Sequence, residues 1–231
     1  MIKALVFDVD GTLAETEEAH RAAFNDTFPV FGLDWHWSRD LYRVLLKTTG
    51  GKERMRAYAA NHLQIDPADI PVADIHKRKT ARYGELIAQG TVPLRPGIAE
   101  LIADARAHNI RLAVATTTNV PNVDALIRAT MHVPARDVFE IIAAGDMVKA
   151  KKPAPDVFQL ALHGLDLRGK HCLAIEDSRN GLKSAMAANI PCLVCPSAYT
   201  DQDDFTGAAA MVQTFRDADN MAKLQSLFVP A

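Results

Sequence analysis

Short apolar runs that end abruptly at polar residues recur along the chain, and we predict that each is a buried strand. They fall within residues 3–8, 110–116, 139–145, 171–177 and 190–195, with a shorter one at 209–214. Amphipathic segments typical of helices alternate with them, at 98–109, 120–131, 155–165, 178–189 and 217–228. Continuous apolar runs are typical of parallel strands, and strands that alternate with helices favour one sheet between helical layers. The expected fold class is therefore α/β, with a three-layer, Rossmann-like parallel sheet.

The stretch between residues 15 and 90 has a different pattern, rich in polar residues with apolar positions at helical spacing. We expect helices within 15–28, 41–49, 52–63 and 73–88, and no strand. Because the first strand belongs to the sheet and this stretch does not, the simplest arrangement is an inserted all-helical cap domain. The predicted boundaries are residues 1–15 and 95–231 for the α/β core and residues 16–94 for the cap, with linkers near 14–16 and 91–96.

Composition and charge restrict the classes of partner. The chain has 231 residues, of which 48% are hydrophobic, and its formal net charge is −2 without an extended basic run. Nucleic acid is not expected as the main partner, because phosphate backbones require clustered Lys and Arg. No apolar stretch reaches the roughly 18 residues of a membrane helix, so no membrane partner is expected, and the first strand begins too early for a secretory signal. We expect a monomeric, cytoplasmic protein that acts on a small molecule.

Three cysteines, Cys172, Cys192 and Cys195, raise the question of redox or zinc chemistry. The last two form a C-x-x-C, but their segment IPCLVCP is apolar and strand-like, and neither a second C-x-x-C nor a suitably spaced His accompanies it. We predict that these thiols are buried and act as small hydrophobic side chains.

Two acidic pairs directly follow predicted strands: Asp8 and Asp10 after KALVF, and Glu176 and Asp177 after CLAI. The carboxyl ends of neighbouring parallel strands meet at one edge of a sheet, where ligands bind in open α/β folds. Carboxylates gathered there form a pocket of hard oxygen ligands, which suits Mg2+. Such a cation would reduce the repulsion between an attacking carboxylate and a phosphate. The sequence therefore predicts a Mg2+-dependent phosphoryl-transfer enzyme.

Four motifs occur in order along the chain: FDVDGTL at 7–13, VATTT at 114–118, KKPAPD at 151–156 and IEDS at 175–178. With these motifs the chain resembles the haloacid dehalogenase-like superfamily, whose members are mostly phosphatases. The resemblance covers essentially the whole chain and implies the same core with an inserted cap. In the dehalogenases of this superfamily the second Asp of the first motif is replaced, so Asp10 favours phosphate chemistry over carbon–halogen cleavage.

The resemblance assigns roles to the acidic motifs. Asp8 would be the nucleophile that forms an aspartyl-phosphate, which divides one difficult displacement into two easier ones. Asp10 would protonate the leaving oxygen and later deprotonate the attacking water, and its backbone carbonyl would bind the metal. Asp177 would ligate Mg2+ directly, and Glu176 would be either a ligand or a partner of the ligands.

The second motif would contact the phosphate. Thr116 ends a predicted strand just before a helix, where a hydroxyl and backbone N–H groups suit a phosphate oxygen. Thr117, Thr118 and Asn119 are further donors, although a Thr-rich loop by itself is more often a helix cap.

The third motif would supply a positive charge. Lys152 directly precedes a proline, as the lysine of the family does, and would neutralise the nucleophile and the transferring phosphoryl group. Lys149 and Lys151 are nearby competitors for that role.

Specificity must come from the cap, because the core motifs bind a single phosphoryl group. Helical spacing places Glu17 and His20 on one face, about one turn apart, near the first linker. The candidate cap residues are polar, basic or glycine: Glu17, His20, Tyr42, Gly50, Gly51, Lys52, Arg54, His76 and Lys79. A basic cap that faces a core with a metal and a lysine suits a substrate with a phosphate at each end.

Several segments narrow the resemblance, among them AETEEAHRAAFN, TTGGKERM, ADIHKRKT and AAGDMVKAKKPAPD. They look like segments of the CbbY-type phosphatases, which remove the 1-phosphate of xylulose 1,5-bisphosphate, an inhibitor of the Calvin-cycle enzyme Rubisco. By this resemblance the cap residues would hold the sugar and its distal phosphate.

Other functions compete with this one. A β-phosphoglucomutase shares the fold and an equivalent His, but it must protect its aspartyl-phosphate from water. A phosphoglycolate-type phosphatase needs a cap that accommodates only a small acid, for which this basic cap is more than sufficient. A receiver-type signalling module also combines acids, Thr, Lys and Mg2+, but it is much shorter and has no helical insertion.

Overall fold

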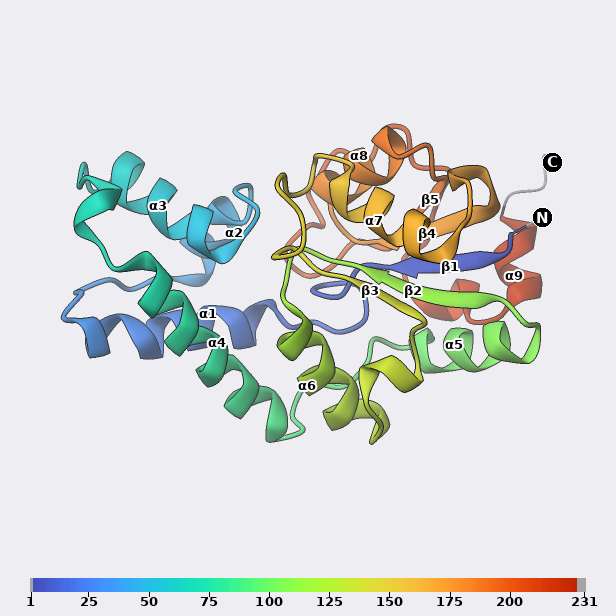
Figure 1. Cartoon of the computed structure of the whole chain (residues 1–231), viewed down its shortest axis with the longest axis horizontal. Helices are drawn as coiled ribbons and strands as arrows, with labels where there is room; N and C mark the ends of the chain where they lie inside the picture. Colours follow the sequence, from blue (N-terminus) through green and yellow to red (C-terminus); the bar gives the residue numbers. More distant parts are fainter. Residues whose placement is uncertain (1, 228–231) are drawn as a thin grey trace.

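Six parallel strands of the described part of the chain form the sheet around which it is organised (Figure 1). The computed structural model describes residues 2–227. The strands are β1 (Ala4–Phe7), β2 (Arg111–Ala115), β3 (Ile141–Ala143), β4 (Cys172–Glu176), β5 (Cys192–Val194) and β6 (Ala210–Met211). Their order in the sheet is β3-β2-β1-β4-β5-β6. The predicted parallel α/β sheet is confirmed, and each strand lies within its predicted run.

The central position of β1 decides where the polar strand ends meet. Phe7 is in register with Val114 on β2 and with Ile175 on β4. The residues that follow on all three strands therefore lie at the same carboxyl edge of the sheet. The chain order reverses between β1 and β4, and such a switch point is where open α/β sheets form their ligand crevice.

Helices cover both faces of the sheet. They are α5 (Ile98–Ala107), α6 (Val120–Met131), α7 (Asp156–Leu165), α8 (Arg179–Ala187) and α9 (Met221–Ser226). Side chains alternate between the faces: Leu5 and Phe7 pack in one cluster with α5, α6 and α9, whereas Ala4 and Val6 pack in another with α7 and α8. Figure 1 shows α7 and α8 on one side of the sheet and α5 and α6 on the other. These layers are the three that the sequence predicts.

Between β1 and β2 in the sequence, four helices form a separate group that lies beside the sheet (Figure 1). They are α1 (Glu17–Thr27), α2 (Arg39–Leu45), α3 (Gly51–His62) and α4 (Val72–Ala88). Buried aromatic side chains, among them Phe24, Phe28 and Trp37, fill a hydrophobic cluster of their own. No strand is present between residues 16 and 90, all of which the structure describes, so the predicted helical stretch is confirmed. We call α1–α4 and their connections the helical segment.

The chain passes between the helical segment and the sheet at two adjacent points. Ala14 forms an antiparallel bridge with Leu94, and the Arg95 backbone N–H donates to the Leu13 carbonyl over 2.8 Å. Both predicted linkers therefore lie side by side.

The remaining differences from the sequence prediction concern the end of one helix, the turns and the end of the chain. The helix predicted for 41–49 ends at Leu45, so residues 46–49 are not part of it. Short 3-10 helices occur at Phe28–Phe31, Pro67–Asp69, Ala135–Asp137, Gly169–His171 and Phe215–Ala218. The last of these and α9 replace the single helix predicted for 217–228, because Asn220 lies between them in an extended conformation and caps α9. Residue 228 of that prediction lies outside the described residues.

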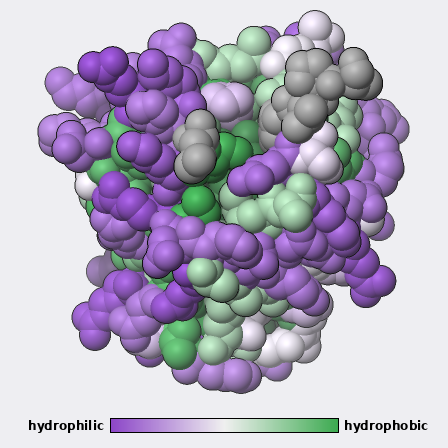
Figure 2. Space-filling model, turned by 90° about the vertical axis from the view of Figure 1, so that its right-hand side faces the viewer, coloured by the Kyte–Doolittle hydropathy of each residue, from purple (hydrophilic) through white to green (hydrophobic). Residues whose placement is uncertain are grey.

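The three thiols lie inside the molecule, and polar side chains lie on its surface. Cys172, Cys192 and Cys195 are free and buried, which confirms their prediction. Hydrophilic side chains cover much of the end of the molecule opposite the helical segment (Figure 2). None of the helices within residues 2–227 is both long and apolar enough to cross a membrane.

Candidate active site

Three buried carboxylates lie together at the carboxyl edge of the sheet. Asp8 follows β1, Glu176 ends β4 and Asp177 follows it, so the pairing of these strands brings the side chains together. One oxygen of each carboxylate lies within 4.8 Å of the other two. The residues are 7%, 0% and 3% exposed, which leaves little water to screen their repulsion.

The carboxylates carry more negative charge than their surroundings neutralise. Burial raises the pKa of Asp8 well above its ordinary value of 3.8, Lys152 opposes this shift, and Glu176 and Asp177 add to it. Burial and the charge of Glu176 raise the pKa of Asp177 to about 8. A divalent cation would relieve both effects. Because the donor set consists of carboxylate oxygens, it fits Mg2+.

Two threonine hydroxyls hold the carboxylate of Asp177. Thr200 Oγ1 lies 2.7 Å from the Asp177 carbonyl oxygen and 3.2 Å from its Oδ2. On the other side, Thr12 Oγ1 is 3.4 Å from Oδ1. Gly11 has φ of 85°, and a Cβ there would lie 2.2 Å from Asp177 Oδ2. Glycine therefore permits both the turn after β1 and its close approach to this carboxylate.

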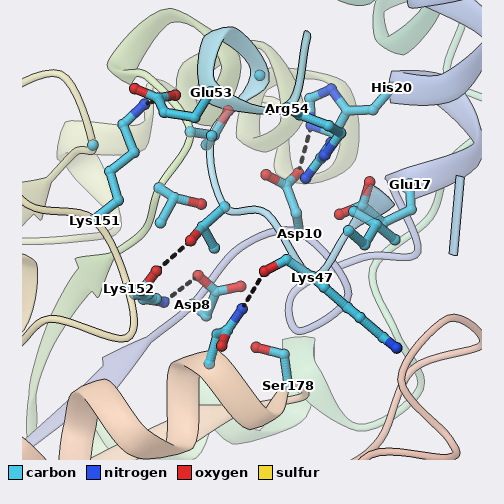
Figure 3. Close-up of a pocket in the computed structure, with 18 of the residues that line it drawn as sticks. Asp8, Asp10, Glu17, His20, Lys47, Glu53, Arg54, Lys151, Lys152 and Ser178 are labelled. Atoms are coloured by element: carbon cyan, nitrogen blue, oxygen red, sulfur yellow. Dashed lines mark hydrogen bonds and ion pairs between the residues drawn. The ribbon is translucent and has the colours of Figure 1, made fainter. Parts of the chain in front are cut away.

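Lys152 bridges two of the three acids. Its Nζ lies 2.6 Å from Asp8 Oδ1 (Figure 3). The same Nζ lies 2.6 Å from Glu176 Oε1. Burial by itself would lower the pKa of Lys152, but Asp8 and Glu176 reverse that effect and raise it. The other oxygen of Glu176 accepts from the Asp177 N–H over 3.2 Å, so Glu176 orients the lysine and the loop rather than facing the cavity. Of the competing lysines, Lys151 pairs instead with Glu53, at 2.9 Å.

Asp10 points away from the acidic cluster, toward the helical segment (Figure 3). Its Oδ1 accepts from Thr16 Oγ1 over 2.6 Å and lies 2.9 Å from His20 Nε2. His20 Nδ1 is in turn 2.6 Å from Lys79 Nζ. Burial would raise the pKa of Asp10, but His20, Thr16 and Lys79 outweigh it and lower the pKa to about 2. Asp10, His20 and Lys79 thus form a continuous polar network from the first motif to α4.

A cavity of about 1030 Å³ lies between the carboxyl edge of the sheet and the helical segment. Asp8, Asp10, Lys152 and Asp177 line it from the sheet. Most of the other predicted site residues also line it: Glu17, His20, Gly50, Gly51, Lys52, Arg54, His76, Lys79, Thr117, Thr118 and Asn119. Asn119 caps α6 as well, since its side chain accepts from the Asn122 N–H over 2.9 Å. The fold therefore brings together residues from both parts of the chain.

Two predicted site residues support the cavity from behind its wall. The Tyr42 hydroxyl donates to Glu17 Oε2 over 2.9 Å and accepts from Arg54 Nη1 over 2.9 Å, and Tyr42 is fully buried. Thr116 is 1% exposed, and its hydroxyl accepts from the Thr118 N–H over 3.2 Å. Neither residue is part of the lining. Each instead orients neighbours that are.

The paired glycines bring the start of α3 close to its neighbours. Gly50 has φ of 91°, and a Cβ there would lie 2.2 Å from Glu53 Oε2. A Cβ on Gly51 would lie 2.9 Å from His76 Cδ2. Burial lowers the pKa of His76 to about 4, and the charges of Lys79 and Lys52 add to the shift. At neutral pH His76 is therefore an uncharged member of the wall.

The structure adds wall residues that the sequence analysis missed. Four of them are basic: Arg43, Lys47, Arg179 and Lys183. The last two could have been found, because they are four residues apart on the helix that follows IEDS. Ser197 and Thr200 also line the cavity, from a loop after β5 that carries no motif.

Comparisons with known proteins agree with this geometry. A profile of the haloacid dehalogenase-like hydrolases matches residues 2–189. "Protein CbbY" of Cereibacter sphaeroides is 54% identical over 224 residues, 97% of this chain and 97% of that protein. "Protein CbbY" of Rhodobacter capsulatus is 60% identical over 207 residues, 90% and 91% of the two chains.

Solved structures show the same fold. A D10N variant of CbbY from Rhodobacter sphaeroides, in complex with xylulose 1,5-bisphosphate, superposes with a TM-score of 0.92 at 54% identity and covers 97% of this chain and 99% of its own. A β-phosphoglucomutase from Clostridium difficile gives a TM-score of 0.79 at 21% identity, covering 99% and 97% of the two chains. The second likeness concerns the fold alone.

We expect Mg2+ to raise the melting temperature of this protein, because a ligand that binds the folded state stabilises it. The change to test is Asp177→Asn, which should remove most of the rise because one charged oxygen ligand is lost. The matched control is Asp34→Asn, an exposed acid of the helical segment. Thermal unfolding would be followed with MgCl2 and with EDTA. An undiminished rise in Asp177→Asn would contradict a metal at this cluster.

Proposed function

This chain belongs to the haloacid dehalogenase-like hydrolase family and is a phosphatase, and we propose that it removes the 1-phosphate of xylulose 1,5-bisphosphate through an aspartyl-phosphate on Asp8, with Mg2+ as cofactor. The observation that carries the proposal is the pairing of Asp8 with Lys152 at one end of a cavity whose other end is basic. The relatives named CbbY, one of them solved with this bisphosphate, support the choice of substrate.

Asp8 acts as the nucleophile in this proposal. A bond forms between a carboxylate oxygen of Asp8 and phosphorus while the bond from phosphorus to the sugar oxygen breaks. Lys152, 2.6 Å from Asp8, offsets the negative charge that gathers as the two anions approach. Mg2+, bound through Asp8, Asp177 and the Asp10 carbonyl, would supply further positive charge to the phosphoryl oxygens.

Asp10 moves the proton. It gives a proton to the sugar oxygen as that group leaves and takes one from the water that then hydrolyses the aspartyl-phosphate. The negative charge of a bound phosphate favours the protonated form of Asp10, against the cationic side chains that otherwise keep it ionised. Thr16 and His20 hold its carboxylate for both steps.

The helical segment binds the rest of the substrate. Lys52, Arg54 and Lys79 provide positive charge for the distal phosphate. The backbone at Gly50 and Gly51 would allow close approach of an anion. Glu17 would contact sugar hydroxyls, and His20 would hold Asp10 beside them. The paired phosphates of the substrate thus meet opposite ends of one cavity.

We also propose that residues 16–94 act as a cap domain over a core formed by residues 1–15 and 95–231. The paired linkers would allow the cap to open for substrate entry and to close over the reacting groups. Contacts such as that from Thr49 Oγ1 to the Lys152 carbonyl support a closed arrangement here. The monomeric state and the cytoplasmic location stay predictions.

A panel of sugar mono- and bisphosphates, assayed with Mg2+ for phosphate release, tests the proposal. Xylulose 1,5-bisphosphate should have the highest kcat/KM and yield xylulose 5-phosphate. Preference for phosphoglycolate would favour the broader phosphatase. Transfer of phosphate between sugar positions without release would favour a β-phosphoglucomutase.

Asp8→Asn should abolish phosphate release while the fold survives, because the substitution keeps the shape of the side chain but replaces the nucleophilic carboxylate with an uncharged amide. Asp10→Asn should reduce kcat by about 10²–10⁴-fold, the usual scale for loss of an acid–base group. Steady-state kinetics and circular dichroism measure both effects. Activity of Asp8→Asn above a few per cent of wild type would exclude Asp8 as the nucleophile.

Arg54→Ala should lower kcat/KM for the bisphosphate about 10- to 100-fold, the range for one hydrogen bond to a charged group. The loss on a sugar monophosphate should be much smaller, because that substrate has no distal phosphate. Arg56→Ala, an exposed arginine on the same helix, is the matched control. Equal losses on both substrates would mean that Arg54 does not meet the second phosphate.

Lys79 should make substrate binding depend on pH. Burial lowers its pKa to about 7, against the attraction of Asp10. The ammonium group is therefore lost as pH rises through about 7, and KM for the bisphosphate should increase above that pH. Lys79→Met experiences the same ionisation of the substrate, so the ratio of wild-type to variant KM between pH 6 and 9 isolates the lysine. A constant ratio would contradict this role.

A further inference from the structure

The loop of residues 197–201, which follows β5, contacts both the acidic cluster and the helical segment. From the inside, Thr200 Oγ1 lies 2.7 Å from the Asp177 carbonyl oxygen and 3.2 Å from its carboxylate. Ser197 supports that position, since its N–H donates to Thr200 Oγ1 over 2.9 Å and its own hydroxyl is 3.0 Å away. The placement of Asp177 therefore depends on the shape of this loop.

From the outside, α2 holds the same loop. Arg43 Nη2 donates to the Ala198 carbonyl over 2.7 Å, Nη1 lies 3.4 Å from the Tyr199 carbonyl, and the guanidinium pairs with Asp201. These contacts flank Thr200 in sequence on both sides. The guanidinium geometry suits this task, because several fixed donors can engage separate oxygens at once.

Tyr199 adds further contacts between the loop of residues 197–201 and the helical segment. It is 5% exposed, and its ring lies edge-on to the Tyr42 ring with centroids 5.8 Å apart. Its hydroxyl donates to Glu18 on α1. Tyr42 in turn holds Glu17 and Arg54 of the cavity wall. Packing is thus continuous from the wall that would bind substrate to the loop that fixes Asp177.

We propose that the loop of residues 197–201 couples docking of the helical segment to the placement of Asp177, and that Arg43 is the positioning residue at this junction. The inference rests on the proposed function, since it concerns the metal and closure of that site. If the helical segment moved away, Arg43 would leave the loop and Thr200 would lose its external support. Metal binding and docking therefore favour each other, and linkage requires the coupling to be reciprocal.

A direct effect of charge predicts the opposite result. Arg43 is a cation in the wall of the same cavity, so its repulsion alone would weaken the binding of Mg2+. Removal of this charge would then tighten metal binding. If Arg43 acts by holding the loop, its removal loosens metal binding despite the lost repulsion. The sign of the change separates the two roles.

The test is a titration of the full chain with Mn2+, with free Mn2+ measured by electron paramagnetic resonance and Mg2+ as competitor. Arg43→Ala should raise the dissociation constants of both metals about fivefold, near the lower end of ordinary coupling between sites. Arg43→Lys keeps the charge but not the fork of donors, and should raise them about two- to threefold. It also serves if the alanine variant does not fold, as judged by circular dichroism.

Arg82→Ala is the matched control, because Arg82 pairs with Asp26 and Glu85 inside the helical segment and touches neither the loop nor the cavity. Its metal affinity should equal that of wild type. Unchanged or tighter binding in Arg43→Ala, or an equal loss in Arg82→Ala, would overturn the coupling. Phosphate release by the wild type tests the proposed function separately, so the two ideas can fail independently.

Discussion

The repulsion among Asp8, Glu176 and Asp177 is the constraint on which the rest of the site depends. Parallel pairing of β1 with β4 forces the carboxylates together, and burial removes the water that would screen them. Lys152 offsets part of this charge through contacts with Asp8 and Glu176. The remaining excess of negative charge suits a divalent cation, which in the proposed function would help to bind an anionic phosphate. The carboxyl edge of the sheet thus holds the excess of negative charge that a metal-dependent phosphatase needs.

The helical segment provides the complementary charge. Arg54 and Lys79 face the acidic edge across the cavity, and each is buried against aromatic side chains. His20 joins the two sides, since its ring lies between Asp10 and Lys79. In the proposed function, the group that would transfer protons is thereby tied to a group that would bind the substrate. Docking of the helical segment would affect chemistry and binding together.

Similarity of fold and similarity of sequence support different conclusions about this chain. The β-phosphoglucomutase shares the fold at 21% identity, and the same sheet edge would serve either transfer or hydrolysis. The CbbY proteins share more than half of their residues with this chain over nearly its whole length. The substrate therefore has to be argued from the cavity wall, where Gly50, Gly51 and Arg54 lie, and not from the sheet.

The sequence by itself determined the sheet, the helical stretch and the position of the acidic edge. Apolar runs that end at Asp8 and Glu176 are local signals, because strand ends and parallel order follow from patterns along the chain. The match of Lys152 to its motif also selected the lysine that contacts Asp8, although Lys151 is its neighbour. Local sequence patterns are sufficient to predict features that follow from the direction and order of the strands.

Only the tertiary structure decided which side chains form the wall and which support it. Tyr42 and Thr116 lie behind the wall because their hydroxyls bond to Glu17, Arg54 and the Thr118 backbone. Arg43 reaches the loop of residues 197–201 across more than 150 positions of sequence. Such contacts depend on side-chain direction and on how distant elements pack, and no spacing along the chain encodes them.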